Sequence, residues 1–512
     1  METQNTDKIQ RDGGLPSPWQ AELTGPALKT GFNNSQRFDV IVVGGGITGL
    51  TAALSLQQKG KQVLVLDAHR PGYGTTGGTS AHINTFADTT YQEAESGFGE
   101  EGAQLFADAV NEGHAVIKAL IDQHNITCDY AEKNGYVYAE DEDQVKQLED
   151  IYNSALKVGV DMAYETEVPT PVPFQQAVII PGQAQFHPIK YLQGLLTAFE
   201  AAGGVVMENV LADDVSKEDE TLTVKAGELT FTAGAVIYAT HIPPKITSFS
   251  FRCAPYRSYV LGVKLKDANY PDALIYDMQE PYHYVRTHEI DGEQLLIIGG
   301  NDHKTGHDDP EKAFEDLEKY TRQYYNVSSV KYRWSAQYYI PADGFPYIGQ
   351  MPEAPEGVYC ATGYNGNGMM LGSIAGKILS DLIATGESKY KEIFSPARIK
   401  PITGFTEFIK ENADVAYHFV ADRFNIDETE SLQGLAPGTG KVVEVDGEKI
   451  AAYRDEAGKI HALTPVCTHA ACIVNFNDAE RSWDCPCHGA RYDIDGKVIT
   501  GPATRGLAKI GN

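Results

Sequence analysis

The sequence predicts an α/β protein of several domains that ends in a separate small domain. A chain of 512 residues is too long for one hydrophobic core, so two or three domains are expected. Near the N-terminus, two short apolar runs flank a glycine-rich turn and a helical pattern, which is the order of a βαβ unit. Near the C-terminus, cysteines and histidines gather between residues 467 and 488, which indicates a compact domain built around a metal centre.

The βαβ unit is complete. Residues 38–43 are continuously apolar apart from one Asp, as in a buried parallel strand, and the turn Gly44-Gly-Gly46-Ile-Thr-Gly49 follows directly. Residues 50–59 have the pattern of a helix, and residues 63–66 form a second strand that ends at Asp67. Together these elements are the fingerprint of a Rossmann-type dinucleotide-binding domain.

Each residue type in this fingerprint has a physical role. Gly44 permits the tight turn, and Gly46 lets backbone amides approach a pyrophosphate. Gly49 allows the helix to pack closely on the strand, and Asp67 is placed to accept a hydrogen bond from a ribose hydroxyl. The fingerprint alone does not distinguish FAD from NAD.

The C-terminal cysteines and histidines have the spacing of a Rieske [2Fe–2S] centre. Cys467-Thr-His469 is followed, after fifteen residues, by Cys485-Pro-Cys487-His488. In such a centre two thiolates hold one iron and two imidazoles hold the other, which raises the potential. The expected metal ligands are therefore Cys467, Cys485, His469 and His488. Structural zinc is the alternative, because Cys/His clusters often bind zinc.

The surrounding residues favour iron and sulfide over zinc. They resemble the high-potential Rieske family, with Trp483-Asp484 before the second ligand pair and a proline-bearing loop at 501–503. The resemblance implies an all-β domain with a disulfide between Cys472 and Cys487. It also implies that Tyr492 hydrogen-bonds to a cysteine sulfur.

One residue departs from the respiratory Rieske pattern. Ala490 stands where those proteins usually carry a serine whose hydroxyl donates to a bridging sulfide. A missing donor makes the more negative, reduced cluster less favourable. We therefore expect a reduction potential below that of the respiratory proteins.

Later segments indicate FAD. The loop at 74–84 resembles the Gly/Ser/Thr loop beneath the flavin in the D-amino-acid oxidase (DAO) superfamily, which includes glycine and sarcosine oxidases. Residues 203–210 and 359–371 resemble its adenine-contacting strand and its closing FAD loop. The expected FAD-binding residues are Gly44, Gly46, Gly49, Asp67, Thr79, Ser80, Val210, Gly363, Gly368, Met369 and Met370.

The whole layout resembles a bacterial family of FAD-dependent oxidoreductases with a C-terminal Rieske domain. The resemblance covers about residues 37–390 and 430–510, and there is no second glycine fingerprint for NAD(P)H. Gly366-Asn367 departs from it, since a basic residue and Trp are expected there, and this puts the shape of the pocket in doubt.

The resemblance also implies how the domains alternate along the chain. The predicted fold is an α/β FAD-binding domain, an interleaved mixed-sheet substrate domain and an all-β Rieske domain. The expected divisions are an irregular segment at 1–36, an FAD-binding domain at 37–95, 175–250 and 340–388, a substrate domain at 96–174 and 251–339, a linker with an amphipathic helix at 389–429, and a Rieske domain at 430–512.

Two expected strands supply candidates for a substrate pocket. In the superfamily, aromatic side chains line the pocket and an Arg or Lys commonly holds a carboxylate. The candidates are Tyr256, Arg257, Tyr259, Tyr282, Tyr284 and Arg286. Because strand side chains alternate, Tyr282, Tyr284 and Arg286 share one face and His283 lies on the other. The alternative is that these are ordinary sheet aromatics and a solvated arginine. His82 is a weaker candidate for a covalent FAD link.

Composition limits the partners. The net charge of −28 makes nucleic acid and anionic membranes poor partners. The first residues lack a signal-peptide pattern, and no apolar run is long enough to span a bilayer, so a cytoplasmic location is expected.

These features lead to three functional hypotheses. The first is a dehydrogenase that oxidises a C–N bond of an amine or amino acid and passes electrons singly from FAD to the [2Fe–2S] cluster and on to an external acceptor. In the second, a partner protein reduces the cluster, which feeds the flavin for reductive chemistry. The third is a redox sensor or scaffold without turnover.

Overall fold

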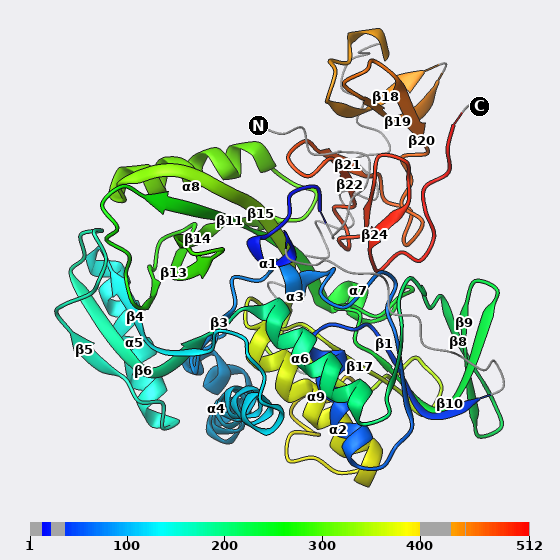
Figure 1. Cartoon of the computed structure of the whole chain (residues 1–512), viewed down its shortest axis with the longest axis horizontal. Coiled ribbons are helices and arrows are strands. Elements are labelled where there is room, and N and C mark those ends of the chain that lie inside the picture. Colours follow the sequence, from blue (N-terminus) through cyan, green and yellow to red (C-terminus); the bar gives the residue numbers. More distant parts are fainter. Residues whose placement is uncertain (1–12, 22–35, 400–431, 446, 511–512) are drawn as a thin grey trace.

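A computed structural model describes residues 13–21, 36–399, 432–445 and 447–510. Two large sheets form the body of the molecule, and the C-terminal strands lie against one side of it (Figure 1). The predicted fold class is confirmed: an α/β portion with interleaved sheets is followed by a C-terminal portion made mostly of strands.

The first sheet contains the predicted βαβ unit. Its central strand β1 (Arg37–Val43) pairs in parallel with β2 (Val63–Leu66) and β10 (Leu229–Tyr238). Both faces of β1 are covered, which is why its sequence is almost continuously apolar. The order is β16-β17-β10-β1-β2-β7, with β9 and β8 added beside β10; the remaining strands are β7 (Val205–Met207), β8 (Asp214–Glu218), β9 (Thr221–Ala226), β16 (Tyr347–Gln350) and β17 (Val358–Thr362).

Long helices cover one face of this sheet. Val40 and Val42 pack against them, whereas Ile41 and Val43 pack on the opposite face. The helices are α2 (Ile47–Gln58), α4 (Tyr91–His124), α6 (Pro188–Ala201) and α9 (Gly368–Thr385). Helix α4 begins at Tyr91, because Thr90 and Glu93 form a capping box there, and Gly99 (φ 74°) kinks the helix without ending it.

The second sheet is mixed and has nine strands, in the order β15-β11-β14-β13-β12-β4-β6-β3 with β5 beside β6. Helix α8 (Pro310–Tyr324) packs on β11, β14 and β15, and α5 (Glu142–Lys157) packs on β4 and β6. The strands are β3 (His82–Ile83), β4 (Ala131–Ala139), β5 (Ala163–Glu165), β6 (Gln176–Gln185), β11 (Cys253–Leu265), β12 (Leu274–Tyr276), β13 (His283–Ile290), β14 (Glu293–Lys304) and β15 (Val327–Pro341).

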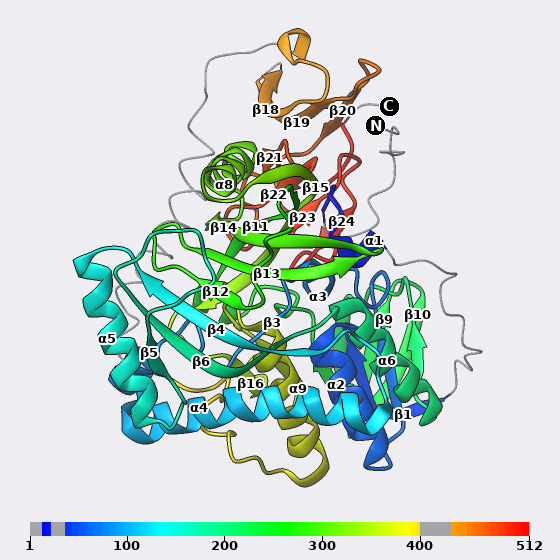
Figure 2. The same ribbon diagram turned by 60° about the vertical axis from the view of Figure 1, so that its left-hand side comes forward.

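The C-terminal portion has two small antiparallel sheets. In Figure 2 the sheet β21–β24 lies beside β11 and β15, and the sheet β18–β20 lies farther out. The elements are η1 (Leu432–Gly434), β18 (Gly440–Val445), β19 (Glu448–Arg454), β20 (Ile460–Leu463), β21 (Asn475–Asn477), β22 (Ser482–Asp484), β23 (Arg491–Tyr492) and β24 (Val498–Thr500).

Two expectations about connecting segments have different outcomes. The segment 1–36 was expected to be irregular apart from an anchor at Trp19, and the structure places Trp19, fully buried, in the short helix α1 (Pro18–Ala21). The amphipathic pattern at 401–424 lies outside the described residues. The other short helices are α3 (Thr75–Gly78) and α7 (Phe249–Arg252). Among the helices that the structure describes, none combines the length and the apolar character needed to cross a bilayer.

Candidate active site and metal centre

A large cavity opens at the carboxyl edge of the parallel sheet, where β1 and β2 end. The turn after β1 and the side chain of Asp67 line one end of it. The second sheet supplies another wall, and residues 498–504 from the C-terminal portion close a third side. Ligands of open α/β folds bind at this edge of the sheet.

The turn between β1 and α2 has no space for a side chain at two of its glycines, Gly44 and Gly49. Gly44 has φ +105°, and a Cβ there would lie 2.4 Å from the carbonyl oxygen of Ala239. A Cβ at Gly49 would lie 1.9 Å from the carbonyl oxygen of Gly44, so the helix packs directly on the turn. Gly46, at the N-cap of α2, lines the cavity, and the helix end beside it can bind the pyrophosphate of FAD.

The acidic residue after β2 also organises this turn. One oxygen of Asp67 accepts from the Gly45 amide at 2.8 Å, and the other accepts from the His69 amide at 2.8 Å. Its carboxylate keeps lone pairs for a ribose hydroxyl. The glycine cradle and this carboxylate together fit a dinucleotide.

Eight of the expected FAD-binding residues line the cavity: Gly44, Gly46, Asp67, Thr79, Ser80, Val210, Gly368 and Met369. The other three do not. Gly49 supports the turn from behind, Gly363 turns the chain beside Pro341 at φ +76°, and the buried sulfur of Met370 accepts from the Asn84 amide at 3.4 Å.

Buried donors hold the loop that follows α3. The Arg286 guanidinium donates to the carbonyl oxygens of Ser80 and Ala81, both at 2.8 Å. The indole of Trp19 donates to the carbonyl oxygen of Thr79, also at 2.8 Å. Arg286 therefore fixes the backbone of the loop and does not line the cavity, so the expectation that it holds a substrate carboxylate is wrong.

The expected pocket residues divide between two places. Tyr282 and Tyr284 line the cavity, but Tyr256, Arg257 and Tyr259 do not. On β11 it is Ser258 that faces the cavity, because alternate side chains of a strand point to opposite faces and Arg257 and Tyr259 point to the other one. The alternation on β13 is as expected, because His283 lies on the far face, 2.8 Å from Asp277.

Other residues of the cavity wall were not among the candidates, including Tyr276, Tyr338 and Asp88. Tyr338 lies on β15, directly opposite Tyr256 of β11. No local sequence pattern indicates this pairing, so the sequence alone did not identify Tyr338 as a candidate. Asp88 lies in a loop and is brought to the wall by hydrogen bonds to the closing loop: its carboxylate accepts from the Gly366 amide at 2.7 Å.

The C-terminal cysteines and histidines converge as expected for a Rieske centre. The rings of His469 and His488 lie 4.9 Å apart, and all four of their nitrogens are buried without a hydrogen-bond partner among the described residues. Burial lowers the pKa of His488 to about 3, so the imidazole is neutral, the form that binds iron. The Tyr492 hydroxyl lies 3.2 Å from the Cys467 sulfur, as the resemblance implied.

The predicted disulfide between Cys472 and Cys487 is present. The sulfurs of these two residues and of Cys485 lie within 4.8 Å of one another, but the disulfide removes two of them as thiolate ligands. The residues left for a metal are the two free thiols, Cys467 and Cys485, with the two imidazoles. This donor set fits a [2Fe–2S] cluster.

The loop that carries His488 contacts β15 of the second sheet directly. The Tyr339 hydroxyl donates to the His488 carbonyl oxygen at 3.2 Å, and the Gln337 amide donates to the Gly489 carbonyl oxygen at 3.0 Å. Gln337 itself lines the cavity, and so does His241, whose ring lies 4.7 Å from that of Tyr339. Single side chains therefore connect the cavity wall to the metal-binding loop.

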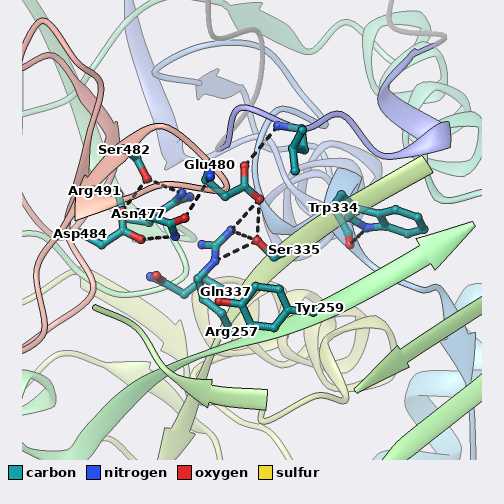
Figure 3. A network of polar contacts seen from close by, with 12 residues as sticks. Arg257, Tyr259, Trp334, Ser335, Gln337, Asn477, Glu480, Ser482, Asp484 and Arg491 are labelled. Carbon is teal, nitrogen blue, oxygen red and sulfur yellow. Dashed lines mark hydrogen bonds and ion pairs between the residues drawn. The ribbon is translucent and has the colours of Figure 1, made fainter. Parts of the chain in front are cut away.

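A buried ionic network lies on the other side of β11 (Figure 3). Arg257 lies 3.6 Å from Glu480 of the C-terminal portion, and Ser335 bridges them, donating to Glu480 at 2.5 Å. The amide of Leu15 donates to the second Glu480 oxygen at 3.2 Å. Arg257 thus joins the two portions of the molecule, so its expected place in the substrate pocket is wrong.

Comparison with known proteins agrees with both halves of this site. Residues 39–382 match the family model "FAD dependent oxidoreductase" (DAO), and residues 423–511 match the Rieske [2Fe-2S] domain. The chain is 33% identical to the putative Rieske 2Fe-2S iron-sulfur protein YhfW of Bacillus subtilis, over 92% of this chain and 93% of that protein. It is 23% identical to gamma-glutamylputrescine oxidoreductase of Escherichia coli, over 73% of this chain and 89% of that protein.

Among solved structures, glycine oxidase from Geobacillus kaustophilus superposes with a TM-score of 0.60 at 19% identity, covering 71% of this chain and 100% of that one. At this identity the likeness shows the fold.

Proposed function

The chain belongs to the DAO family of FAD dependent oxidoreductases and carries a Rieske [2Fe-2S] domain, and on that premise we propose that it oxidises a C–N bond of an amine or amino acid and passes the electrons through the cluster to an external one-electron acceptor. The observation that carries the proposal is the contact between the cavity and the cluster loop. Gln337 lines the cavity and donates to Gly489, next to the ligand His488.

When bound, FAD accepts a hydride equivalent and the cluster carries single electrons. The residues of the chain bind the cofactor and orient the substrate. The glycine turn and the N-terminus of α2 would hold the pyrophosphate of FAD, while Arg286 and Trp19 fix the backbone of the cavity loop at Thr79 and Ser80. Tyr282 and Tyr284 exclude water from the substrate side and align the C–N bond.

Close packing of the two portions favours electron transfer within one chain. His488 is 3% exposed and faces the FAD portion, where the Phe251 ring lies 6.2 Å from its own. His469 is half-buried, which leaves one ligand nearer to solvent and to an external acceptor.

Anaerobic mixing of the holoprotein with a panel of amines and amino acids tests the proposal. We expect bleaching of the flavin absorption, followed by the EPR signal of a reduced Rieske cluster. A flavin that is fully reduced by substrate beside a cluster that stays oxidised would contradict the proposed path. Reduction of the flavin only through a reduced partner protein, with no response to any amine, would favour the reverse direction of flow.

A further inference from the structure

The substrate side of the cavity has an aromatic wall. Tyr276, Tyr282, Tyr284, Tyr338 and Phe86 line it. The rings of Tyr282 and Tyr284 lie 5.9 Å apart, and that of Phe86 meets the ring of Tyr276 edge-on at 4.9 Å. Such a group of rings encloses alkyl groups and attracts a cation through its π faces.

The charges on this wall are negative. Asp88 lines the cavity and is exposed there. Among the described residues that line the cavity, none is Lys or Arg. Arg286, the arginine expected to hold a carboxylate, is fully buried behind the loop, where its guanidinium donates to backbone carbonyl oxygens and lies 2.7 Å from the ring of His288.

A second carboxylate lies directly behind the tyrosines. The hydroxyls of Tyr338 and Tyr282 donate to the same oxygen of Asp302, at 2.8 Å and 3.2 Å. The other oxygen of Asp302 is buried and has no hydrogen-bond partner among the described residues. The strand β14 is irregular here, with Asn301 at φ 54°, and a bulge of this kind redirects a side chain beside a site.

Asp302 also has no cationic partner among the described residues. Within the described part of the chain, no Lys, Arg or His forms an ion pair with it, and its neighbours are Ser258, Asp88 and tyrosines. A carboxylate in such surroundings is costly unless a positive charge comes close to it.

His82 adds an acceptor on the same wall. It lines the cavity, its Nδ1 lies 3.2 Å from the Ser80 hydroxyl, and its Nε2 is buried without a partner among the described residues. Burial and the nearby Arg286 hold the pKa of His82 well below its ordinary value, so the ring is neutral. A neutral imidazole can accept a hydrogen bond from an amine N–H.

We propose that the cavity takes a cationic amine that carries no carboxylate near its nitrogen, with the tyrosine wall enclosing its alkyl groups and Asp88 and Asp302 balancing its charge. This inference rests on the proposed function, because it names the substrate class of the same site. An α-amino acid would bring its carboxylate toward these two carboxylates without a basic partner, and in a low-dielectric cavity that repulsion is large.

Three probes of nearly equal shape separate these possibilities. Choline is a cation, 3,3-dimethylbutan-1-ol is its neutral analogue, and glycine betaine adds a carboxylate. Titration of the oxidised holoprotein, followed through the flavin spectrum and by calorimetry, gives a dissociation constant for each probe. We expect choline to bind at least tenfold more tightly than either of the other two.

Substitution of Asp88 and Asp302 tests whether these two carboxylates cause the preference for choline. Asp302→Asn and Asp88→Asn should each weaken choline binding at least fivefold and leave binding of the neutral alcohol unchanged. Asp291→Asn, in the exposed β13–β14 turn, removes the same charge away from the cavity and should bind choline as the wild type does. If Asp302→Asn does not fold with FAD, Tyr338→Phe, which removes one donor to Asp302, replaces it, and a smaller loss of choline affinity is expected.

Equal binding of choline and glycine betaine, or wild-type choline affinity in both folded Asp variants, would overturn the inference. Failure of the proposed function looks different. In that case the probes bind as expected, but no amine reduces the flavin. If carboxylate-bearing amino acids are the ones that reduce it, the proposed function holds and the inference fails.

Discussion

Alternate side chains of β11 face two different environments. Ser258 and Val260 line the cavity, whereas Arg257 and Tyr259 point to the other face of the sheet. The cavity face offers hydroxyls, aromatic rings and carboxylates, and none of the described lining residues is Lys or Arg. The opposite face holds a fully buried Arg257 that pairs with Glu480 of the Rieske portion.

Charged side chains therefore have a different role on each face of β11. On the far face, opposite charges are already paired, and they join two parts of the same chain. On the cavity face, negative charge is left for a ligand to balance. One strand thus positions the substrate wall and the electron-carrying domain at once, with adjacent residues serving different purposes.

The largest effect is expected from loss of a cluster ligand, which should abolish electron transfer to the acceptor while FAD remains bound. His488→Ala removes an iron ligand, and we expect the purified protein to contain FAD but no Rieske cluster. Because even residues that only support metal ligands contribute 10–100-fold, reduction of an external one-electron acceptor should fall at least about 100-fold. Iron and FAD content per chain and stopped-flow absorption measure this. His461→Ala, in the same domain but not a ligand, should keep its iron; its loss of the cluster would contradict the assignment.

Breaking the ion pair between Arg257 and Glu480 should lower the stability of the contact on the far face of β11 and leave the cavity face unchanged. Glu480→Ala leaves Arg257 buried without its carboxylate, which costs roughly 3–5 kcal/mol of unfolding free energy. Circular dichroism of the cluster during denaturation follows the unfolding of the Rieske portion. Glu448→Ala, exposed in the same portion, should change the unfolding free energy by less than about 0.5 kcal/mol. Equal stability of the two variants would show that the pair does not hold the domains together.

Protonation of Asp302 should change ligand affinity in the cavity and leave the ion pair on the far face of β11 unchanged. Burial raises the pKa of Asp302 to about 6, so its carboxyl is mostly protonated at pH 5 and mostly ionised at pH 7. Choline affinity should therefore rise with pH, by about tenfold over this interval if only the carboxylate form binds. Asp88, Tyr282, Tyr284, Tyr338 and Ser258 face this group; the pKa of Asp88 is also raised, and that of the tyrosines lies above this range. Calorimetry at several pH values should give a flatter profile for Asp302→Asn; an unchanged slope would assign the titration to another group.

A smaller effect is expected at the cluster itself. Ala490→Ser restores a hydroxyl in the position from which respiratory Rieske proteins donate to a sulfide. One such bond contributes about 1 kcal/mol, which is about 40 mV for a one-electron couple. Protein-film voltammetry should show a more positive potential in the variant, with flavin content unchanged. A potential that does not move would mean that the hydroxyl finds another partner.

The local chemistry of both cofactor sites could be predicted from the sequence. The nucleotide-binding turn and the following acidic residue depend on residues close together in the chain, namely Gly44–Gly49 and Asp67. The cluster site depends on ligand types at a fixed spacing, namely Cys467, His469, Cys485 and His488. The two strands of the βαβ unit were placed within a residue of their observed bounds for the same reason.

The substrate wall depended on tertiary structure. Alternation separates Arg257 from Ser258, but which of the two faces of β11 meets the cavity is decided by the elements that pack on either side of the sheet. Arg286 has the residue type of a carboxylate holder, but the loop carbonyls packed around it use its donors.

The sequence by itself determined the fold class and the two cofactors, because each is encoded by short segments whose residue types leave few alternatives. Only the tertiary structure decided that the cavity wall and the cluster loop touch, that Asp88 lines a cavity with no Lys or Arg among its described lining residues, and that Asp302 lies behind its tyrosines. These facts depend on contacts between residues from about 20 to nearly 300 positions apart, and such contacts are set by packing of whole sheets and not by any local pattern.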